Sequence, residues 1–142
     1  MNLRRKKILA AVATIWAIGM IAFIPDFVAV HRETKSAFLT FDQYAGSLVS
    51  RNYRAAYALC GTEFQNATPF GVYEGTYQGL ADRLGKLQSV QRGAYEVKGR
   101  GSPATWTATI ETSFIYEKQT LRFRLALRKN GGRWLVYGAE EM

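Results

Sequence analysis

Few residues in this 142-residue chain could carry metal or nucleophilic chemistry. Its one histidine, His31, and one cysteine, Cys60, exclude an internal disulfide and most zinc sites, because zinc needs four protein ligands or three plus water. The acidic residues are not clustered at the short spacing of a calcium loop. No histidine lies near Cys60 in the sequence to activate it, so we interpret Cys60 as a small core residue. We expect no metal and no cofactor.

Acid–base chemistry would have to rest on tyrosines and carboxylates. The chain has eight tyrosines, and tyrosine at its usual pKa of about 10 donates a hydrogen bond at neutral pH but is a poor base. A carboxylate would therefore have to be the base. The nearest candidates, Asp42, Glu74 and Asp82, fall on helix faces that the pattern predicts to be exposed. We therefore favour a protein that is not an enzyme.

The composition indicates a folded protein with one domain. Apolar residues make up 48% of the chain and aromatic residues 13%, which is typical of a globular core. The net charge of +8 is unevenly placed, because residues 1–35 contain six basic and two acidic residues and so carry half of the excess. The remaining surplus is mild and no nucleic-acid-binding motif accompanies it. We therefore expect no nucleic acid as a partner.

The N-terminal segment predicts a membrane anchor. Residues 8–24 are 17 consecutive uncharged residues, which as a helix span about 25 Å, the low end of what crosses a bilayer core. The four basic residues at 4–7 place the N-terminus in the cytoplasm and the domain on the extracytoplasmic side of the bacterial inner membrane. A cleaved signal peptide is the alternative, but a cut after Ala29 would place Phe27 where a small residue is needed. We predict a retained single-pass anchor.

Helical spacing of apolar residues dominates the first half of the remaining chain. It predicts a helix over residues 36–50 with one buried face, and a second helical piece over 52–60 that Gly61 ends. A third helix is expected over residues 68–87, with its first residue, a threonine, as the cap and Pro69 at the first helical position. These helices precede all of the predicted strands.

Alternating apolar and polar residues predict strands in the second half. They are expected around 90–98, 106–116, 121–128 and 134–137, with a hairpin turn at 129–133. Helices followed by hairpin-connected strands predict an α+β domain over residues 36–142, with the helices on one face of a curved antiparallel sheet. Residues 1–35 would form the cytoplasmic tip, the transmembrane helix and a junction.

Two phrases of the sequence, Arg-Asn-Tyr-Arg-Ala-Ala-Tyr at 51–57 and Leu-Gly-Lys-Leu-Gln-Ser-Val-Gln at 84–91, carry a family resemblance together with the order of elements. Over residues 38–141 the chain resembles the nuclear transport factor 2-like (cystatin-like α+β) superfamily, and within it small membrane-anchored bacterial domains. The resemblance implies a cone-shaped fold with an apolar cavity between helices and sheet. Some members use this cavity as an active site and others as a ligand pocket, so the fold does not decide the function.

The resemblance also implies which residues face the cavity. Members similar to ketosteroid isomerase need a buried carboxylate base, and dehydratase-type members use a histidine and an aspartate, whereas His31 lies at the membrane junction. Aromatic rings supply the expected ligand-binding set, unless the same rings simply pack as core. This set is Tyr57, Tyr73, Tyr77, Trp106, Phe114, Phe123 and Trp134.

A row of arginines on the third strand is the expected partner-binding surface. Alternation places Arg122, Arg124 and Arg128 on the outer face of the sheet, where they could meet an acidic partner or lipid headgroups. The competing interpretation is a solvated face with ion pairs to Glu111 and Glu117 across the strands.

The sequence therefore predicts a non-catalytic, membrane-tethered extracytoplasmic binding or protein-interaction module of the bacterial envelope. The alternative is a small-molecule enzyme or carrier of the ketosteroid isomerase type that acts on an apolar ligand in the cone cavity. The expected partners are the membrane through residues 8–24, a second copy of the chain or another envelope protein, and an apolar small molecule.

Overall fold

A computed structural model describes residues 27–142 of the chain, and residues Glu33–Met142 form one compact unit. Within the described residues no helix is both long and apolar enough to cross a membrane. The predicted anchor at residues 8–24 and the basic cluster before it lie outside the described residues.

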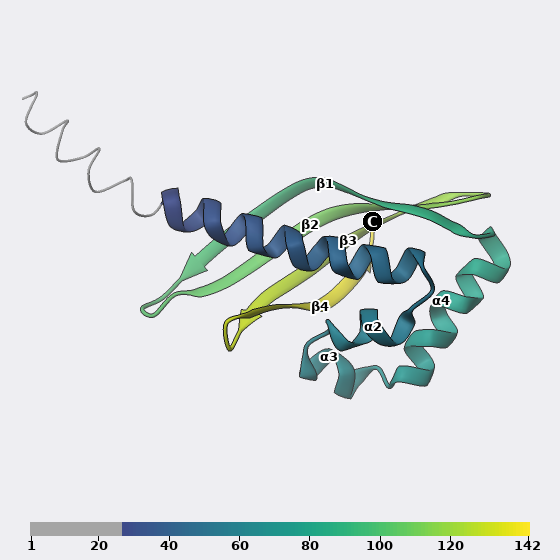
Figure 1. Cartoon of the computed structure of the whole chain (residues 1–142), viewed down its shortest axis with the longest axis horizontal. Helices are drawn as coiled ribbons and strands as arrows, with labels where there is room; N and C mark the ends of the chain where they lie inside the picture. Colours follow the sequence, from purple (N-terminus) through teal and green to yellow (C-terminus); the bar gives the residue numbers. More distant parts are fainter. Residues whose placement is uncertain (1–26) are drawn as a thin grey trace, which may run out of the picture. The chain divides into compact units, whose positions relative to one another are not determined.

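Four antiparallel strands form a meander in which each strand pairs with its neighbour in the chain (Figure 1). They are β1 (Leu87–Arg100), β2 (Thr105–Tyr116), β3 (Thr120–Asn130) and β4 (Arg133–Glu141). The predicted hairpin turn is confirmed: Gly131 and Gly132 join β3 to β4 with φ angles of 57° and 79°. Two successive positive φ angles are typical of the tight turn that matches the twist of paired strands, and glycine adopts them without strain.

The predicted strand register is also confirmed. Ile110 of β2 lies opposite Leu125 of β3, and both side chains are fully buried. Arg122, Arg124 and Arg128 lie between the inward residues of β3 and are exposed. One face of the sheet is therefore part of the core and the other meets solvent.

The first helix is the longest and includes residues 27–49; we call it the long helix. The prediction started this helix at Ser36, so it was too short. Next comes α2 (Tyr53–Ala58), where the Asn52 side chain accepts a hydrogen bond from the Ala55 backbone N–H and caps the helix start. A third short helix, α3 (Thr62–Ala67), was not predicted. The sequence of α3 shows no helical spacing of apolar residues, which is why it was missed. The Tyr57 hydroxyl stabilises the C-terminal end of α3 by donating to the carbonyl oxygens of Gln65 and Thr68.

The last helix, α4 (Phe70–Leu84), differs from the prediction at both ends. Pro69, not Thr68, is the capping residue, and no side chain hydrogen-bonds to the helix start. Gly85 ends the helix with a φ of 83°, so Leu87 is buried in β1 instead of extending the helix. The prediction extended the helix past Gly85 because the helical spacing of leucines continues to Leu87.

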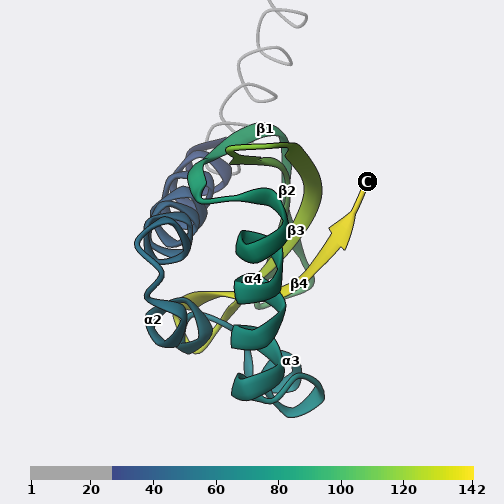
Figure 2. The ribbon, with the colours of Figure 1, turned by 90° about the vertical axis from the view of Figure 1, so that its right-hand side faces the viewer.

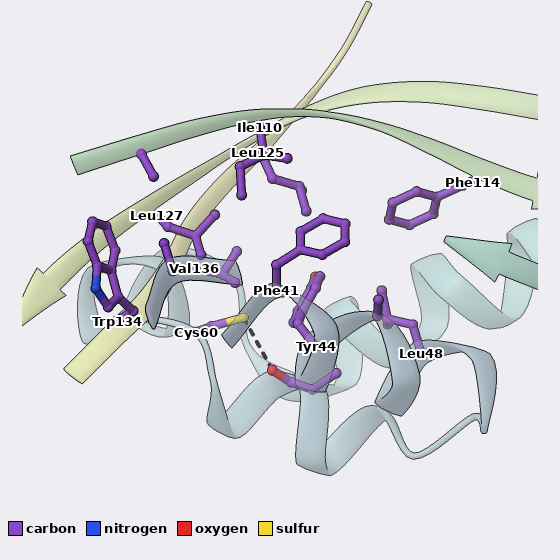
Figure 3. Close-up of a cluster of buried hydrophobic side chains, with 14 of the residues drawn as sticks. Phe41, Tyr44, Leu48, Cys60, Ile110, Phe114, Leu125, Leu127, Trp134 and Val136 are labelled. Carbon is purple, nitrogen blue, oxygen red and sulfur yellow. Dashed lines mark hydrogen bonds between the residues drawn. The ribbon is translucent and has the colours of Figure 1, made fainter. Parts of the chain in front are cut away.

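The core lies between the helices and the inner face of the sheet, which curves around them (Figure 2). Figure 3 shows Phe41 and Tyr44 of the long helix facing Ile110, Leu125 and Val136 of the sheet. This packing brings aromatic residues from three helices and two strands together at one end of the core.

Candidate functional site

Three tyrosine hydroxyls meet in the interior. Tyr44 comes from the long helix, and Tyr73 and Tyr77 come from successive turns of α4. The Tyr73 hydroxyl donates to the Tyr44 oxygen at 2.9 Å, and the Tyr44 and Tyr77 oxygens lie 3.2 Å apart. We call these residues the tyrosine triad. Their hydroxyls are hydrogen-bonded to one another, and no buried side-chain oxygen or nitrogen within residues 27–142 lacks a partner.

Burial keeps the tyrosine triad neutral. It raises the pKa of Tyr44 and Tyr73 well above the usual value, and it raises the pKa of Tyr77 to about 12 although hydrogen bonds from Tyr44 and Tyr73 oppose the shift. A neutral phenol at physiological pH can donate a hydrogen bond but cannot accept a substrate proton. The triad alone therefore has no general base.

Five of the seven residues in the predicted ligand-binding set form a continuous chain of ring contacts. The ring centroids of Tyr57 and Tyr73 are 5.2 Å apart, those of Tyr73 and Tyr77 4.9 Å, those of Tyr77 and Phe114 6.4 Å, and those of Phe114 and Phe123 4.9 Å. Such spacings are typical of aromatic packing. The rings therefore pack against one another between α4 and the sheet.

The other two members of the set lie elsewhere. Trp106 is half-buried near the β1–β2 turn, where its ring covers Gly99. Trp134 is buried in β4, and its indole N–H donates to a carboxylate of the long helix. The structure therefore does not gather the seven rings into one site.

A recess lined by Leu48, Tyr77 and Tyr116 has a volume of about 10 Å³, which is at the lower limit for a single water molecule. A groove of about 290 Å³ adjoins it, with Tyr53, Glu74 and Asp82 among its lining residues. Glu74 and Asp82, two of the three carboxylates predicted to lie on exposed helix faces, therefore border this groove outside the core. The third, Asp42, lies elsewhere, 3.7 Å from Arg92 Nε.

A buried carboxylate that the sequence did not single out comes from the long helix. The Glu33 side chain is 4% exposed; it accepts from Lys129 Nζ at 2.8 Å and from Trp134 Nε1 at 3.1 Å. Both oxygens are thus engaged by donors from β3 and β4. Glu33 ties the start of the domain to the β3–β4 hairpin and has no free oxygen to serve as a base.

Cys60 packs as the sequence predicts. Its side chain is buried, and the thiol donates to the Ala56 carbonyl oxygen at 3.6 Å (Figure 3). Burial raises the pKa of the thiol to about 12, so the reactive thiolate is scarce at neutral pH. Residues 27–142 contain no group of three or more potential metal ligands.

The arginine row lies on the outer face of the sheet and is partly neutralised there. Arg122 is 3.6 Å from a Glu111 carboxylate oxygen, and the Arg128 guanidinium lies 4.3 Å above the Tyr137 ring. The predicted pairing with Glu111 is thus confirmed. Arg124 instead lines a shallow depression of about 470 Å³ beside Glu96. This makes Arg124 the most available cation of the row.

The triad predicts a distinctive alkaline instability. In the folded domain these tyrosines have pKa values above the value of about 10 that they have in the unfolded chain. Their contribution to stability is complete below pH 10 and is lost as the pH rises through the folded pKa, because the unfolded chain ionises first. The free energy of unfolding should therefore fall between pH 10 and 12, by about 1.4 kcal/mol per pH unit for each tyrosine that ionises only on unfolding. Urea titrations of the full chain at stepped pH would measure the slope. A variant with Tyr44, Tyr73 and Tyr77 all changed to Phe should have a shallower slope. It should keep part of the slope because burial also raises the pKa of Tyr116 and of Cys60 to about 12, and an unchanged slope would contradict the account.

Comparison with known proteins identifies the fold. No family model matches the sequence, and no curated protein matches it. The chain is similar to the crystal structure of a protein of unknown function with a cystatin-like fold from Nostoc punctiforme, with a TM-score of 0.57 and 8% sequence identity. The match covers 76% of this chain and 88% of that one. At this identity the likeness shows the fold alone, and the chain therefore has a cystatin-like α+β fold.

Proposed function

We propose that this chain is a non-catalytic, membrane-tethered binding or protein-interaction module of the bacterial envelope. Its domain would belong to the nuclear transport factor 2-like branch of cystatin-like folds. The uncharged run at residues 8–24 and the basic residues before it support a retained anchor in the inner membrane, with the domain on the extracytoplasmic side.

The observation that carries this proposal is the aromatic packing between α4 and the sheet. The rings of the tyrosine triad and its neighbours contact one another there, and the recess beside Tyr77 has a volume of about 10 Å³. The one buried carboxylate within residues 27–142, that of Glu33, is held by Lys129 and Trp134. General acid–base catalysis needs a positioned base within reach of the substrate, and no other carboxylate is buried within residues 27–142.

The outer sheet face is the surface proposed for a partner. Arg124 lies opposite Glu111 of β2 and Glu140 of β4, but no salt bridge within residues 27–142 includes it. Arginine is enriched at the centres of protein interfaces because its planar guanidinium binds carboxylates through two hydrogen bonds. We therefore propose that the partner is an envelope protein that presents acidic residues to this face.

One observation favours the second candidate, an enzyme or carrier of the ketosteroid isomerase type. The groove of about 290 Å³ places Glu74 and Asp82 beside Tyr53, and it adjoins the recess that reaches Tyr77. A rearrangement of Tyr53 would join the two spaces and bring a carboxylate toward the triad. This candidate requires that rearrangement, whereas the first requires none.

Photo-crosslinking in native membranes tests the proposed partner surface. A photoreactive phenylalanine analogue replaces Ala126, an exposed residue between Arg124 and Arg128, in one strain. In a matched control it replaces Asn66, an exposed residue of α3 on the helical side. We expect a discrete crosslinked species at position 126 that is absent at position 66. Equal crosslinking at both positions, or none at position 126, would contradict an interaction through the outer face.

A further inference from the structure

An amphipathic groove lies between one side of α4 and the inner face of β3, on the helical side of the sheet and away from the arginine row. Its volume is about 390 Å³. It is separate from the tyrosine triad, none of whose members lines it. The proposed protein partner on the outer face does not account for this groove.

The floor of the groove is apolar. Leu80 and Leu84 of α4 face Leu121 and Phe123 of β3 across it, and all four side chains are half-buried. They pack against the hydrophobic core on one side and leave apolar surface toward the groove on the other. The volume lies near the small end of the range of roughly 300–1,000 Å³ for ligand sites.

The rim of the groove is polar and fully exposed. Arg83, in the last turn of α4, and Gln119, in the β2–β3 turn, both border the groove. Within residues 27–142 neither side chain takes part in a salt bridge or a side-chain hydrogen bond. A guanidinium and an amide together offer donors for a carboxylate. A cation at the C-terminal end of a helix is favourable by itself, because it interacts with the negative end of the helix dipole. That effect accounts for Arg83 in part, but it does not explain the apolar floor next to Arg83.

Glu141, at the end of β4, is the opposing charge on the rim. A headgroup with two negative charges would be repelled by this carboxylate, whereas a single negative charge can be directed to Arg83 and Gln119. The charge pattern therefore discriminates between anions by their charge.

We propose that this groove binds a linear fatty acid, with the acyl chain over the leucines and Phe123 and the carboxylate at Arg83. Phe123 was predicted from the sequence as a ligand-binding residue, and here it contributes to the floor. The proposal is one of binding, and it assigns no chemical change to the ligand. This function adds to the proposed protein interaction and does not depend on it.

Photolabelling of the full chain in phospholipid nanodiscs tests the proposal. The probe is a ten-carbon fatty acid with a diazirine in the chain, and labelled peptides are mapped by mass spectrometry. We expect labels near Leu80, Leu84, Leu121 and Phe123, with decanoate as an effective competitor. When the free aqueous concentration of each competitor is used, competition from hexanoate to decanoate should strengthen about fourfold per methylene group as the chain fills the floor.

The headgroup is tested with two variants that alter exposed residues and should leave the fold intact. Arg83→Gln should weaken competition by decanoate about tenfold and leave competition by decanol unchanged. Each ligand is compared between the variant and the unaltered chain, so the different partitioning of the two ligands into the bilayer cancels. Glu141→Gln should strengthen competition by decyl phosphate more than by decanoate. Arg100→Gln, on β1, is the matched control and should change nothing.

Three outcomes would overturn the proposal. Labels spread evenly over the domain would mean that the groove is not a site. An equal effect of Arg83→Gln on decanoate and decanol would mean that Arg83 does not bind the carboxylate of the ligand. Decyl phosphate competing more strongly than decanoate in the unaltered chain would refute the selection against two charges.

Discussion

Leu125→Asp is expected to unfold the domain, whereas Arg124→Asp, one residue away, should leave it folded. Leu125 is 0% exposed and packs opposite Ile110, while Arg124 lies on the outer face. A buried carboxylate without a partner costs several kcal/mol, which is comparable to a whole domain stability of about 5–15 kcal/mol. On the outer face the new aspartate meets Glu111 and Glu140 across the strands, and such like-charge pairs cost at most about 1 kcal/mol each.

Near-ultraviolet circular dichroism and urea unfolding of the full chain in detergent would compare the two variants. Residues 1–26 are the same in both variants, so their contribution cancels from the comparison. Loss of the cooperative transition in Leu125→Asp alone supports the register. Equal destabilisation by the two substitutions would contradict the assignment of Leu125 to the inner face and Arg124 to the outer face of β3.

Lys129→Met is expected to cost about 3 kcal/mol of folding free energy, even though a methionine of similar size replaces the lysine. The substitution leaves the Glu33 carboxylate, which is 4% exposed, with Trp134 as its remaining donor. Removing one partner of a buried ion pair typically costs about 3–5 kcal/mol because the other charge stays buried. We expect the lower end because the Lys129 side chain is 29% exposed, so the site is not fully shielded from solvent.

A second substitution separates the lost ion pair from lost packing. The double variant Glu33→Gln with Lys129→Met keeps an acceptor for the Trp134 N–H and removes both charges. It should be more stable than Lys129→Met alone, and the double-mutant cycle would measure the coupling. A double variant that is less stable than either single variant would show that Glu33 and Lys129 act independently.

The sequence predicted the sheet well because its signals there are local. The alternation of leucine with arginine along β3 is visible within eight residues, and the Gly131-Gly132 pair specifies its turn by backbone conformation alone. Boundaries were less accurate where one residue decides them. Gly85 ends α4 although the leucine spacing continues through it.

Glu33 shows why other parts of the site could not be predicted. Its partners lie 96 and 101 residues away in the chain, and no local pattern marks a carboxylate that is neutralised over that distance. It stands next to the predicted anchor, so its sequence context indicated a membrane junction instead of a core.

The interior and the groove had the same difficulty. Aromatic residues at helical and strand spacing predict which rings point inward, and five of the seven do meet. Whether inward rings enclose a cavity or fill it depends on how several elements pack at distances of a few ångströms. The same holds for the groove beside α4, because Leu80 and Phe123 meet through the fold and not through their sequence spacing.

Turnover of a β,γ-unsaturated ketosteroid by the purified full chain tests the central claim, that the domain does not catalyse, most directly. Ultraviolet absorbance of the conjugated product would follow the reaction. With no base in reach of the tyrosine triad, the rate should equal that of buffer, because the factor of about 10²–10⁴ that general acid–base catalysis contributes would be missing. Turnover above buffer that is lost in Glu74→Gln and in Tyr77→Phe would contradict the account and identify an isomerase.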